Sequence, residues 1–520
     1  MNSSKTTYTV FNLSPKPQKA KLNIGGQTLK EEPNPIYLGV KFDPRLTWNA
    51  QAEQSRNKGI RRTALLRKLT GTDWGADHQL LRKAYVGYVR SALEYGLSAW
   101  GTTADSNLQK ICRVQNQNLR IMTGAIRSTP IRDMESLSGL EPMEDRRDLK
   151  QITQLEKIKR IPHHPMKERS NKSTKSRLKR TSFLHDSRRN SQDLDLPTQD
   201  NPEPMTLTST TLWNAQEMPQ IIDSIANVRK KADVPQDILS GMCKEYINEK
   251  YPTGTWTRVY TDGSATDAIR DGGGGIYIEW PDGTTESHAI PTGQHSTNYR
   301  AEMAALEEAA TILITKVHTE HPIVLLSDAK SVLQALETAE HHPMKRLQSI
   351  LCQLHQKTKT VIQWIPGHTN IPGNDEADKL AKEGAKMLQV EHDFDLSEMK
   401  TLTKAAIRKR WNNQHPGFIQ KDAYYSLTRP QQVTIFRLRT GHNRLRQHMF
   451  SKFKVGETPG CRFCKDSPET TSHILQECSH LSTHREEVWD SPTMLRTKLY
   501  GTAEDLRRTV IFIEKTGLKV

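Results

Sequence analysis

The sequence lacks the features that mark secreted and membrane proteins. It has only 6 cysteines in 520 residues, too few for a scaffold held by disulfides. No apolar run approaches the roughly 20 residues that a membrane-spanning helix needs, and the mean hydropathy is −0.71. The first residues, MNSSKTTYTVFNLSPKP, lack the apolar core of a secretory signal. We therefore expect an intracellular protein of the nucleus or cytoplasm, not secreted and with no membrane partner.

Charge is distributed unevenly along the chain. Lys and Arg number 75 against 59 Asp and Glu, a net charge of +16, which favours a polyanionic partner such as nucleic acid. Residues 157–190 carry a net +10 and almost no apolar side chains, a composition typical of a solvated linker. Residues 254–388 carry a net −5, so the rest of the chain carries +21.

These shifts in composition divide the chain into several parts, as its length predicts, because about 100–200 residues are typical of one domain. An acidic, proline-containing stretch at 192–204 follows the basic one and marks the end of the linker. We expect a helical region over 1–155, a basic then acidic disordered linker over 156–210, a helical connector over 211–250, an α/β domain over 254–390 and a basic helical tail over 395–500.

Residues 256–390 alternate between strand and helix patterns. WTRVYTDGSA, GGIYIEW and TESHAI, separated by glycine- and aspartate-rich turns, predict three short strands. A helix is expected from Asn298, which can cap it, and then a strand IVLLSD, two helices, a strand TVIQWIP and a helix over DEADKLAKEGAKML. This order predicts a mixed five-stranded sheet with helices on its faces. Apolar spacings of three and four residues predict mainly helical flanking regions.

Four carboxylates stand where this fold would bring side chains to one edge of the sheet. Asp262 lies in the first strand, and Asp328 ends the strand IVLLSD. Glu302 is one turn into the helix that begins at Asn298, and Asp378 lies on the last helix. Alone, an aspartate at a strand end is more often a turn or cap residue. Four converging carboxylates, however, would repel one another strongly unless divalent cations neutralised them.

Ligands that offer only carboxylate oxygens favour Mg²⁺ or Mn²⁺ over zinc. Two such ions about 4 Å apart orient a water for in-line attack on a phosphodiester and stabilise the departing oxygen. The pattern therefore predicts phosphodiester hydrolysis that depends on two metal ions.

Four segments of this region resemble the signature segments of the ribonuclease H family. They are YTDGS (260–264), STNYRAEMAAL (296–306), LLSDAKSVLQAL (325–336) and IPGHTNIPGNDEADKLA (365–381), in that order. The resemblance implies a ribonuclease H-like fold and cleavage of the RNA strand of RNA–DNA hybrids, leaving 3′-hydroxyl and 5′-phosphate ends. Carried over by position, it implies that metal is bound by Asp262, Glu302, Asp328 and Asp378. It also implies that His368, in a mobile loop, assists proton transfer or product release.

The same resemblance implies contacts with the substrate. Gly263 and Ser264 are expected to present backbone to the RNA strand, where the 2′-hydroxyl distinguishes RNA from DNA. Thr297 and Asn298 match positions that touch the hybrid in relatives, although Asn298 is equally explained as a helix cap. Lys330 stands where relatives often carry a neutral amide, a departure that puts that base contact in doubt.

The acidic domain has little room for a basic substrate-binding helix. Only 40 residues separate Asp328 from His368, and many cellular relatives carry an extra basic helix between these positions. We therefore expect the domain alone to bind hybrid weakly, and the basic linker and the 400–460 tail to supply affinity for nucleic acid.

The flanking segments resemble parts of non-LTR retrotransposon polyproteins. PIYLGVKFDPRLTW (35–48) and YVRSALEYGLSAWG (88–101) resemble the thumb- or connection-like segment after the palm of their reverse transcriptases. FRLRTGHNRLRQH (436–448), followed by a Cys/His cluster at 461–478, resembles the tail of jockey- and I-like elements. No Asp-Asp dipeptide occurs, so the paired palm aspartates are absent and we expect no polymerase activity. The resemblance implies a C-terminal fragment whose partner is a separate reverse transcriptase portion.

The Cys/His cluster has the spacing C-x2-C-x8-H-x4-C. Its residues, Cys461, Cys464, His473 and Cys478, offer the sulfur and imidazole ligands of a closed tetrahedral structural zinc site. The alternative is a helical tail with buried cysteines and no metal. His480 and His484 lie nearby as spare ligands, so the fourth position has more than one candidate.

Three functions fit the sequence. The first is an active Mg²⁺-dependent ribonuclease H. The second is a non-catalytic remnant that binds nucleic acid through its basic segments, and the third is an assembly fragment that docks a polymerase on the 36–125 helices. The complete set of four carboxylates favours the first. A basic run, KSRLKR (175–180), also allows a weaker interpretation as a nuclear-localisation signal.

Overall fold

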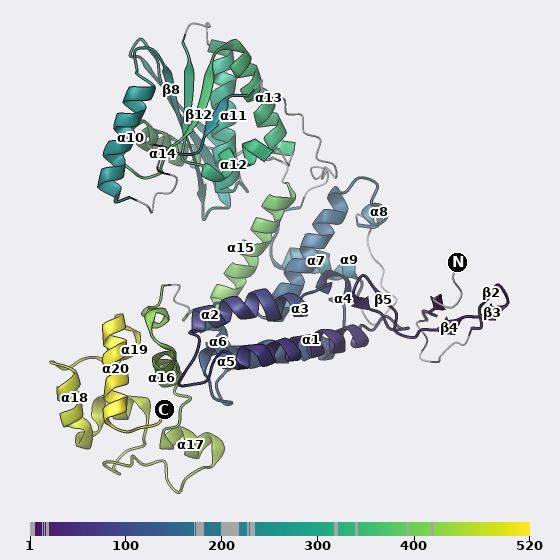
Figure 1. Ribbon diagram of the computed structural model, residues 1–520, viewed down its shortest axis with the longest axis vertical. Helices are drawn as coiled ribbons and strands as arrows, with labels where there is room; N and C mark the ends of the chain where they lie inside the picture. The colour runs from purple at the N-terminus through teal and green to yellow at the C-terminus, as the bar shows by residue number, and fades with distance from the viewer. Residues whose placement is uncertain are drawn as a thin grey trace. The chain divides into compact units, whose positions relative to one another are not determined.

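The computed structural model contains both helices and strands (Figure 1). It describes residues 6–12, 14, 16, 20–170, 172, 181–198, 218–225, 228, 234–316, 321–338, 342–392, 395–417 and 421–520. The chain forms two units: a helical unit (Met1–Ile152, Thr174–Leu194 and Ile407–Val520) and a sheet unit (Thr153–Ser173 and Asp195–Ala406). Within the described residues, every helix is too short or too polar to cross a membrane.

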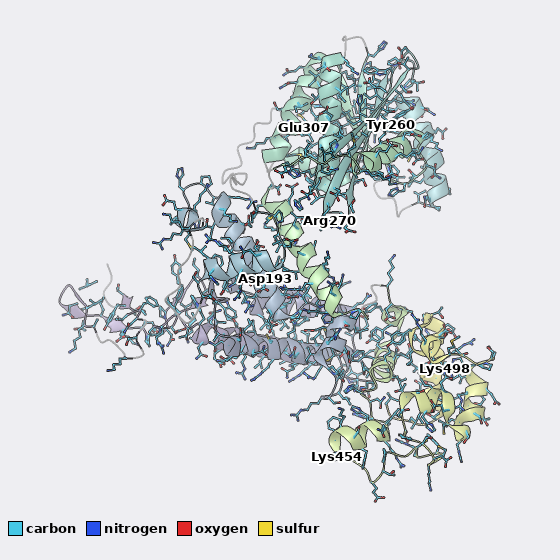
Figure 2. The ribbon with its side chains drawn as sticks, turned by 180° about the vertical axis from the view of Figure 1, so that it is seen from behind. Asp193, Tyr260, Arg270, Glu307, Lys454 and Lys498 are labelled. Atoms are coloured by element: carbon cyan, nitrogen blue, oxygen red, sulfur yellow. The ribbon has the colours of Figure 1, made fainter. Side chains whose placement is uncertain are left out.

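The sheet unit is built on a mixed sheet of six strands. They are β7 (Gln220–Ile222), β8 (Thr257–Thr266), β9 (Arg270–Glu279), β10 (Thr285–Gly293), β11 (Ile323–Ser327) and β12 (Thr360–Trp364). Their order is β10-β9-β8-β11-β12-β7, with β8, β9 and β10 antiparallel and the others parallel to β8. Tyr260, labelled in Figure 2, is only 3% exposed within this sheet.

The five strands expected from the sequence are confirmed, and β7 is an addition. The three residues of β7 are too few to show a period-two pattern, so the sequence does not predict a strand there. They become a strand because the edge of β12 offers unpaired backbone N–H and C=O groups, which β7 pairs in parallel.

Helices cover both faces of the sheet, as the sequence predicts. They are α10 (Gln236–Lys250), α11 (Asn298–Lys316), α12 (Lys330–Thr338), α13 (His342–Lys357) and α14 (Pro372–Gly384). Neighbouring residues of a strand face opposite sides, and a Cβ at Gly274 would touch Ala305 of α11 whereas one at Gly275 would meet Ala377 of α14. The two helices therefore pack on opposite faces.

The cap of α11 corrects one expectation. Thr297 Oγ1 accepts a hydrogen bond from the Arg300 backbone N–H at 3.2 Å, the geometry of an N-cap. Asn298 is the first helical residue and is exposed. Thr297, rather than Asn298, therefore caps the helix.

The helical unit combines residues from both ends of the chain. Its longer helices are α1 (Asn49–Arg67), α2 (His78–Ala84), α5 (Asp105–Thr123), α6 (Ile131–Ser138), α16 (Arg429–Thr440), α17 (Arg446–Phe453), α18 (Ser482–Val488) and α20 (Ala503–Lys515). One apolar core joins Leu119 of α5 to Phe436 of α16 and Val510 of α20. The Arg429 guanidinium donates to the carbonyls of Ile121 and Met122, at the end of α5. Two further helices, α7 (Met143–Arg160) and α15 (Leu396–Gln414), contribute residues to both units.

Part of the expected disordered linker is helical. Within 156–210 the structure contains α8 (Lys167–Ser170) and α9 (Phe183–Asp193). Leu184 of α9 is buried, and Asn190 Nδ2 donates to Asp148 Oδ1 at 2.9 Å. Helix α9 forms because these contacts let a polar segment pack against the rest of the unit. The local composition does not predict such contacts. The basic run 175–180 and the second part of the acidic stretch, 199–204, lie outside the described residues.

Candidate active site

Three acidic side chains from three elements meet at one edge of the sheet. Asp262 lies in β8, Asp328 follows β11, and Glu302 lies one turn into α11. Ser327 pairs with Thr261 in the parallel β8–β11 ladder, so the residues that follow, Asp328 and Asp262, are neighbours. One carboxylate oxygen from each of the three side chains lies within 4.8 Å of the other two. The structure thus brings together three of the four predicted carboxylates.

Gly263 allows α11 to approach β8. A Cβ at this position would lie 2.2 Å from the amide nitrogen of Glu302, a separation that no side chain tolerates. The glycine therefore lets the helix bring Glu302 beside Asp262. Gly263 is also a predicted RNA contact, and the structure adds a packing reason for glycine here.

Asp378, the fourth predicted carboxylate, approaches from α14 on the other face of the sheet. Its charge helps to raise the pKa of Asp262, so it lies near the cluster. Lys382, one turn further along α14, donates a hydrogen bond to Asp378 Oδ2. Among the described residues, the oxygens that meet within 4.8 Å come from the other three carboxylates. Asp378 therefore lies near this cluster and forms an ion pair with Lys382 on its own helix.

A run of glycines in β9 makes the approach of α14 possible, a role that was not predicted from the sequence. A Cβ at Gly273 would lie 2.1 Å from the carbonyl oxygen of Ala381 in α14. The visible signal was DGGGG at 271–275, because consecutive glycines inside a strand mark a close approach of another backbone.

Burial and mutual repulsion disfavour ionisation of the cluster. Burial, and then the charges of Asp328 and Asp378, raise the pKa of Asp262 to about 8. Burial, and then the charges of Asp262 and Asp328, raise the pKa of Glu302. Glu302 Oε2 is buried and has no hydrogen-bond partner among the described residues. Crowded carboxylates with an unsatisfied oxygen fit the oxygen ligands that Mg²⁺ or Mn²⁺ prefers.

His368 lies on the loop between β12 and α14. It is exposed and has a positive φ of 54°. Its carbonyl accepts a hydrogen bond from Gln236 Nε2 at 2.8 Å. The preceding residue, Gly367, lies against the cluster, since a Cβ there would be 2.1 Å from Asp328 Oδ2. The loop therefore passes beside the carboxylates.

The predicted substrate-contact residues differ in their accessibility. Ser264 is half-buried in β8, and Asn298 is exposed. Thr297 is only 8% exposed, and its hydroxyl oxygen is engaged in capping α11. Ser264 and Asn298 thus present surface to a ligand, whereas Thr297 has a structural partner already. Their roles in binding RNA stay predictions.

The comparison with known proteins agrees with this geometry. The family model described as RNase H matches residues 255–386. A ribonuclease H of Cupriavidus pinatubonensis is 30% identical over 140 residues, a match that covers 25% of this chain and 95% of that protein. This chain belongs to the ribonuclease H family. Residues 255–386 are its ribonuclease H domain.

Two further relatives come from transposable elements. The retrovirus-related Pol polyprotein from type-1 retrotransposable element R1 4 of Nasonia vitripennis is 31% identical over 125 residues, covering 24% of this chain and 31% of that protein. The probable RNA-directed DNA polymerase from transposon BS of Drosophila melanogaster is 29% identical over 124 residues, covering 24% of this chain and 14% of that protein. The chain thus spans less than a third of the length of either relative. The predicted resemblance to ribonucleases H and retrotransposon proteins is confirmed.

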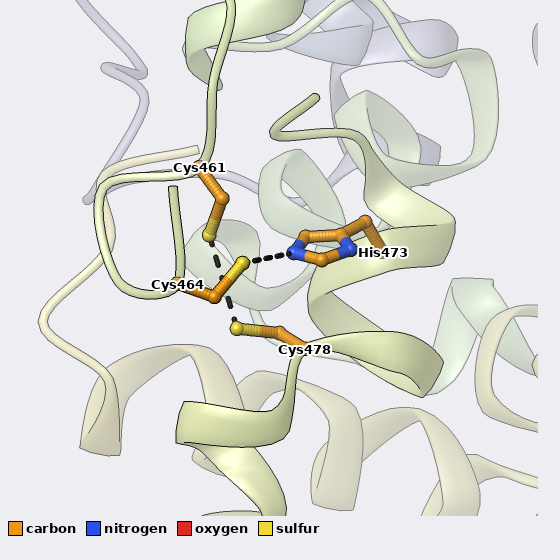
Figure 3. A group of neighbouring side chains, drawn as sticks. All are labelled: Cys461, Cys464, His473 and Cys478. Carbon is orange, nitrogen blue, oxygen red and sulfur yellow. Dashed lines mark hydrogen bonds between the residues drawn. The ribbon is translucent and has the colours of Figure 1, made fainter. Parts of the chain in front are cut away.

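A second candidate site lies outside the ribonuclease H domain, where the Cys/His cluster converges (Figure 3). The Sγ atoms of Cys461 and Cys478 are 3.8 Å apart. Cys464 Sγ lies 3.3 Å from His473 Nε2, and the four ligand atoms all lie within 4.8 Å of one another. The structure thus brings all four predicted ligands together. Within the described residues, this group does not include His480 or His484.

A buried glutamate holds the turn that carries the first two cysteines. Glu469 is fully buried, and its carboxylate accepts hydrogen bonds from the guanidinium and the backbone N–H of Arg462. It also accepts one from the backbone N–H of Arg446, at the start of α17. Glu469 therefore ties the turn to the neighbouring helix.

The environments of the thiols differ. Backbone N–H groups of Asp466 and Ser467 lower the pKa of Cys464, because they stabilise its thiolate. Burial, and then Cys461, raise the pKa of Cys478 to about 11. Three sulfurs and one imidazole are the donor set of a closed structural zinc site. The residues present fit zinc.

Proposed function

We propose that this chain cleaves the RNA strand of RNA–DNA hybrids endonucleolytically, with two Mg²⁺ or Mn²⁺ ions. The observation that carries the proposal is the meeting of Asp262, Glu302 and Asp328 within 4.8 Å. The unsatisfied Glu302 oxygen supports a cation there. The ribonuclease H relatives support the class of substrate.

Each predicted site residue has a role in this proposal. When bound, the ions would activate a water and stabilise the leaving oxygen. Asp262, Glu302 and Asp328 would hold them at the sheet edge, and Asp378 would complete the set from α14. The water oxygen bonds to phosphorus as the P–O3′ bond breaks, which leaves a 5′-phosphate and a protonated 3′-hydroxyl. His368 would move a proton or assist product release from its exposed loop.

Recognition of the RNA strand falls to the residues beside the carboxylates. Gly263 and Ser264 would present backbone to the strand, and Asn298 would offer an exposed amide from the start of α11. The 2′-hydroxyl, which donates and accepts hydrogen bonds, is the group that separates RNA from DNA at such a site. Thr297 would support this contact through the cap of α11 rather than through its hydroxyl.

The test is cleavage of a labelled RNA–DNA hybrid by the full chain with Mg²⁺. We expect only the RNA strand to be cut, at internal positions, with no cleavage of double-stranded DNA. Asp262→Asn should abolish cleavage, whereas Asp267→Asn, at the exposed β8–β9 turn, should not. Wild-type protein that is folded and binds hybrid without cutting it would contradict the proposal.

Binding of nucleic acid through the basic segments is the second candidate function. The net charge of +21 outside the ribonuclease H domain favours it. We propose that the basic linker and tail supply affinity by neutralising phosphates, so log K should fall linearly with log salt concentration. Replacing exposed Lys452 and Lys454 by glutamine should reduce the salt slope by about one for each phosphate that a lysine neutralises in the wild type. An unchanged slope would remove these residues from the interface.

We further propose that the Cys/His cluster holds structural zinc.

The retrotransposon relatives support a separate reverse transcriptase portion as partner, and no polymerase activity is expected from this chain. The low cysteine count, 6 in 520 residues, supports a reducing compartment, either nucleus or cytoplasm.

A further inference from the structure

Residues 218–225, 228 and 234–251 precede the segment that the family model matches, yet they are built into the sheet unit. β7 extends the sheet at β12, pairing Ile221 with Ile362. Leu239 and Cys243 of α10 are fully buried in the same apolar cluster as the sheet. Tyr251, at the end of α10, is 1% exposed in this cluster. We call residues 218–225, 228 and 234–251 the brace.

The brace contacts the loop that carries Asp328. Lys330 Nζ, two residues further on, donates to the Asp223 carbonyl at 2.9 Å and lies 4.6 Å from the centre of the Trp364 ring. Gln363, at the end of β12, donates to the Ser224 carbonyl at 2.8 Å. These bonds connect the brace to the start of α12, just after Asp328, and to the end of β12.

The brace also contacts the loop that carries His368. Gln236, the first residue of α10, donates through Nε2 to the His368 carbonyl at 2.8 Å. His368 has a φ of 54°, in the left-handed region that a residue with a side chain seldom adopts. Such a conformation persists only where surrounding contacts hold it. The Gln236 side chain supplies one such contact from outside the family segment.

We propose that the brace is part of the catalytic unit and that Gln236 is a positioning residue for His368. The inference rests on the proposed function, because it assigns Gln236 a role through a residue of that site. Gln236 holds the carbonyl of an exposed loop residue, so its removal should free the histidine without disturbing the buried carboxylates. The proposed catalytic unit therefore begins near residue 218 rather than at 255.

The first test uses three variants of the full chain. Gln236→Glu keeps the size of the side chain but cannot donate when ionised, whereas Gln236→Lys keeps a donor. Asp267→Asn changes an exposed residue at the β8–β9 turn, outside the brace, and is the control. We expect Gln236→Glu to lower kcat by up to about 100-fold, the cost of misplacing a catalytic group by roughly 1 Å, with KM little changed. Gln236→Lys and the control should match the wild type.

A double-mutant cycle separates positioning from a general structural effect. If Gln236 acts through His368, then Gln236→Glu should lower kcat no further in a His368→Ala background. An undiminished effect in that background would overturn the positioning role. Equal kcat for wild type and Gln236→Glu would overturn it as well.

A second readout does not depend on activity. Amide hydrogen exchange over residues 366–371 should be faster in Gln236→Glu than in wild type, while exchange in β8 and α11 stays the same. Unchanged exchange in the loop would contradict the proposal. If the wild type proves inactive, the proposed function fails, and the exchange result alone decides whether Gln236 holds the loop.

Discussion

Gly275 of β9 lies so close to Ala377 of α14 that a Cβ on the glycine would be 1.9 Å from the Ala377 carbonyl oxygen. Gly275 is also the cross-strand partner of Asp262, and Asp378 follows Ala377 in α14. The absence of one side chain therefore sets the distance between a helix and a strand that each carry a predicted metal ligand.

We expect Gly275→Ala to destabilise the sheet unit and to abolish hybrid cleavage. The added methyl group would clash with the Ala377 carbonyl oxygen. Helix α14 must therefore move away from the sheet, and Asp378 moves with it. Overpacking of this kind costs about 1–3 kcal/mol, and the lost ligand should affect activity beyond that. Thermal unfolding and the cleavage assay measure the two effects.

Gly254→Ala is the matched control, because a Cβ there meets nothing within 4 Å and the backbone is not in the left-handed region. It should behave like the wild type. Equal behaviour of the two alanine variants would show that α14 does not need the glycine.

Glu302→Gln should raise the melting temperature of the metal-free protein. Removing one charge relieves the repulsion that raises the pKa of Asp262 and Glu302, and each kcal/mol gained is worth about 2–4 °C for a unit of this size. Mg²⁺ should stabilise the wild type by binding the folded state and should stabilise this variant much less. Glu308→Gln, exposed on the same helix, should keep the wild-type response to Mg²⁺. A full response from Glu302→Gln would remove Glu302 from the metal site.

The purified chain should contain one tightly bound zinc ion. Cys464→Ser should lose most of the metal, because it removes the ligand with the most stabilised thiolate. Cys352→Ser, half-buried in α13, should retain it. Elemental analysis measures the content, and a strong chelator should lower the melting temperature of the helical unit, since structural metal binding adds to folding stability. Zinc-free protein of unchanged stability would contradict the assignment.

Glu135 of α6 predicts a pH dependence of stability in the helical unit. Burial, and then the charges of Glu144 and Asp145, raise its pKa from 4.5 to about 8. Because the folded state holds this proton more tightly than the unfolded state, stability is lost as the pH rises from 4.5 to about 8. Glu135→Gln removes that loss, so its gain in melting temperature should be small near pH 5 and largest above pH 8. Calorimetry over this range checks it, with Glu504→Gln as the exposed control.

Much of the ribonuclease H domain was predictable because its chemistry follows local patterns. The local sequence pattern predicts an apolar strand that carries Asp262, a second one followed by Asp328, and a helix that places Glu302 one turn from its start. In the same way, the spacing of Cys461 and Cys464 predicts a metal-binding turn. These patterns predict the folded structure correctly because a strand or a helix orients its side chains in the same way wherever it packs.

The sequence by itself therefore determined which residues carry the chemistry, while the tertiary structure decided what holds them. Gln236 contacts His368 across 132 positions of the chain, and Arg429 caps the carbonyls at the end of α5 across 308. β7 becomes a strand only because it pairs with the edge of β12. α9 becomes a packed helix only because Leu184 is buried against the rest of the protein. Such partners depend on packing between distant segments, and no local periodicity encodes that.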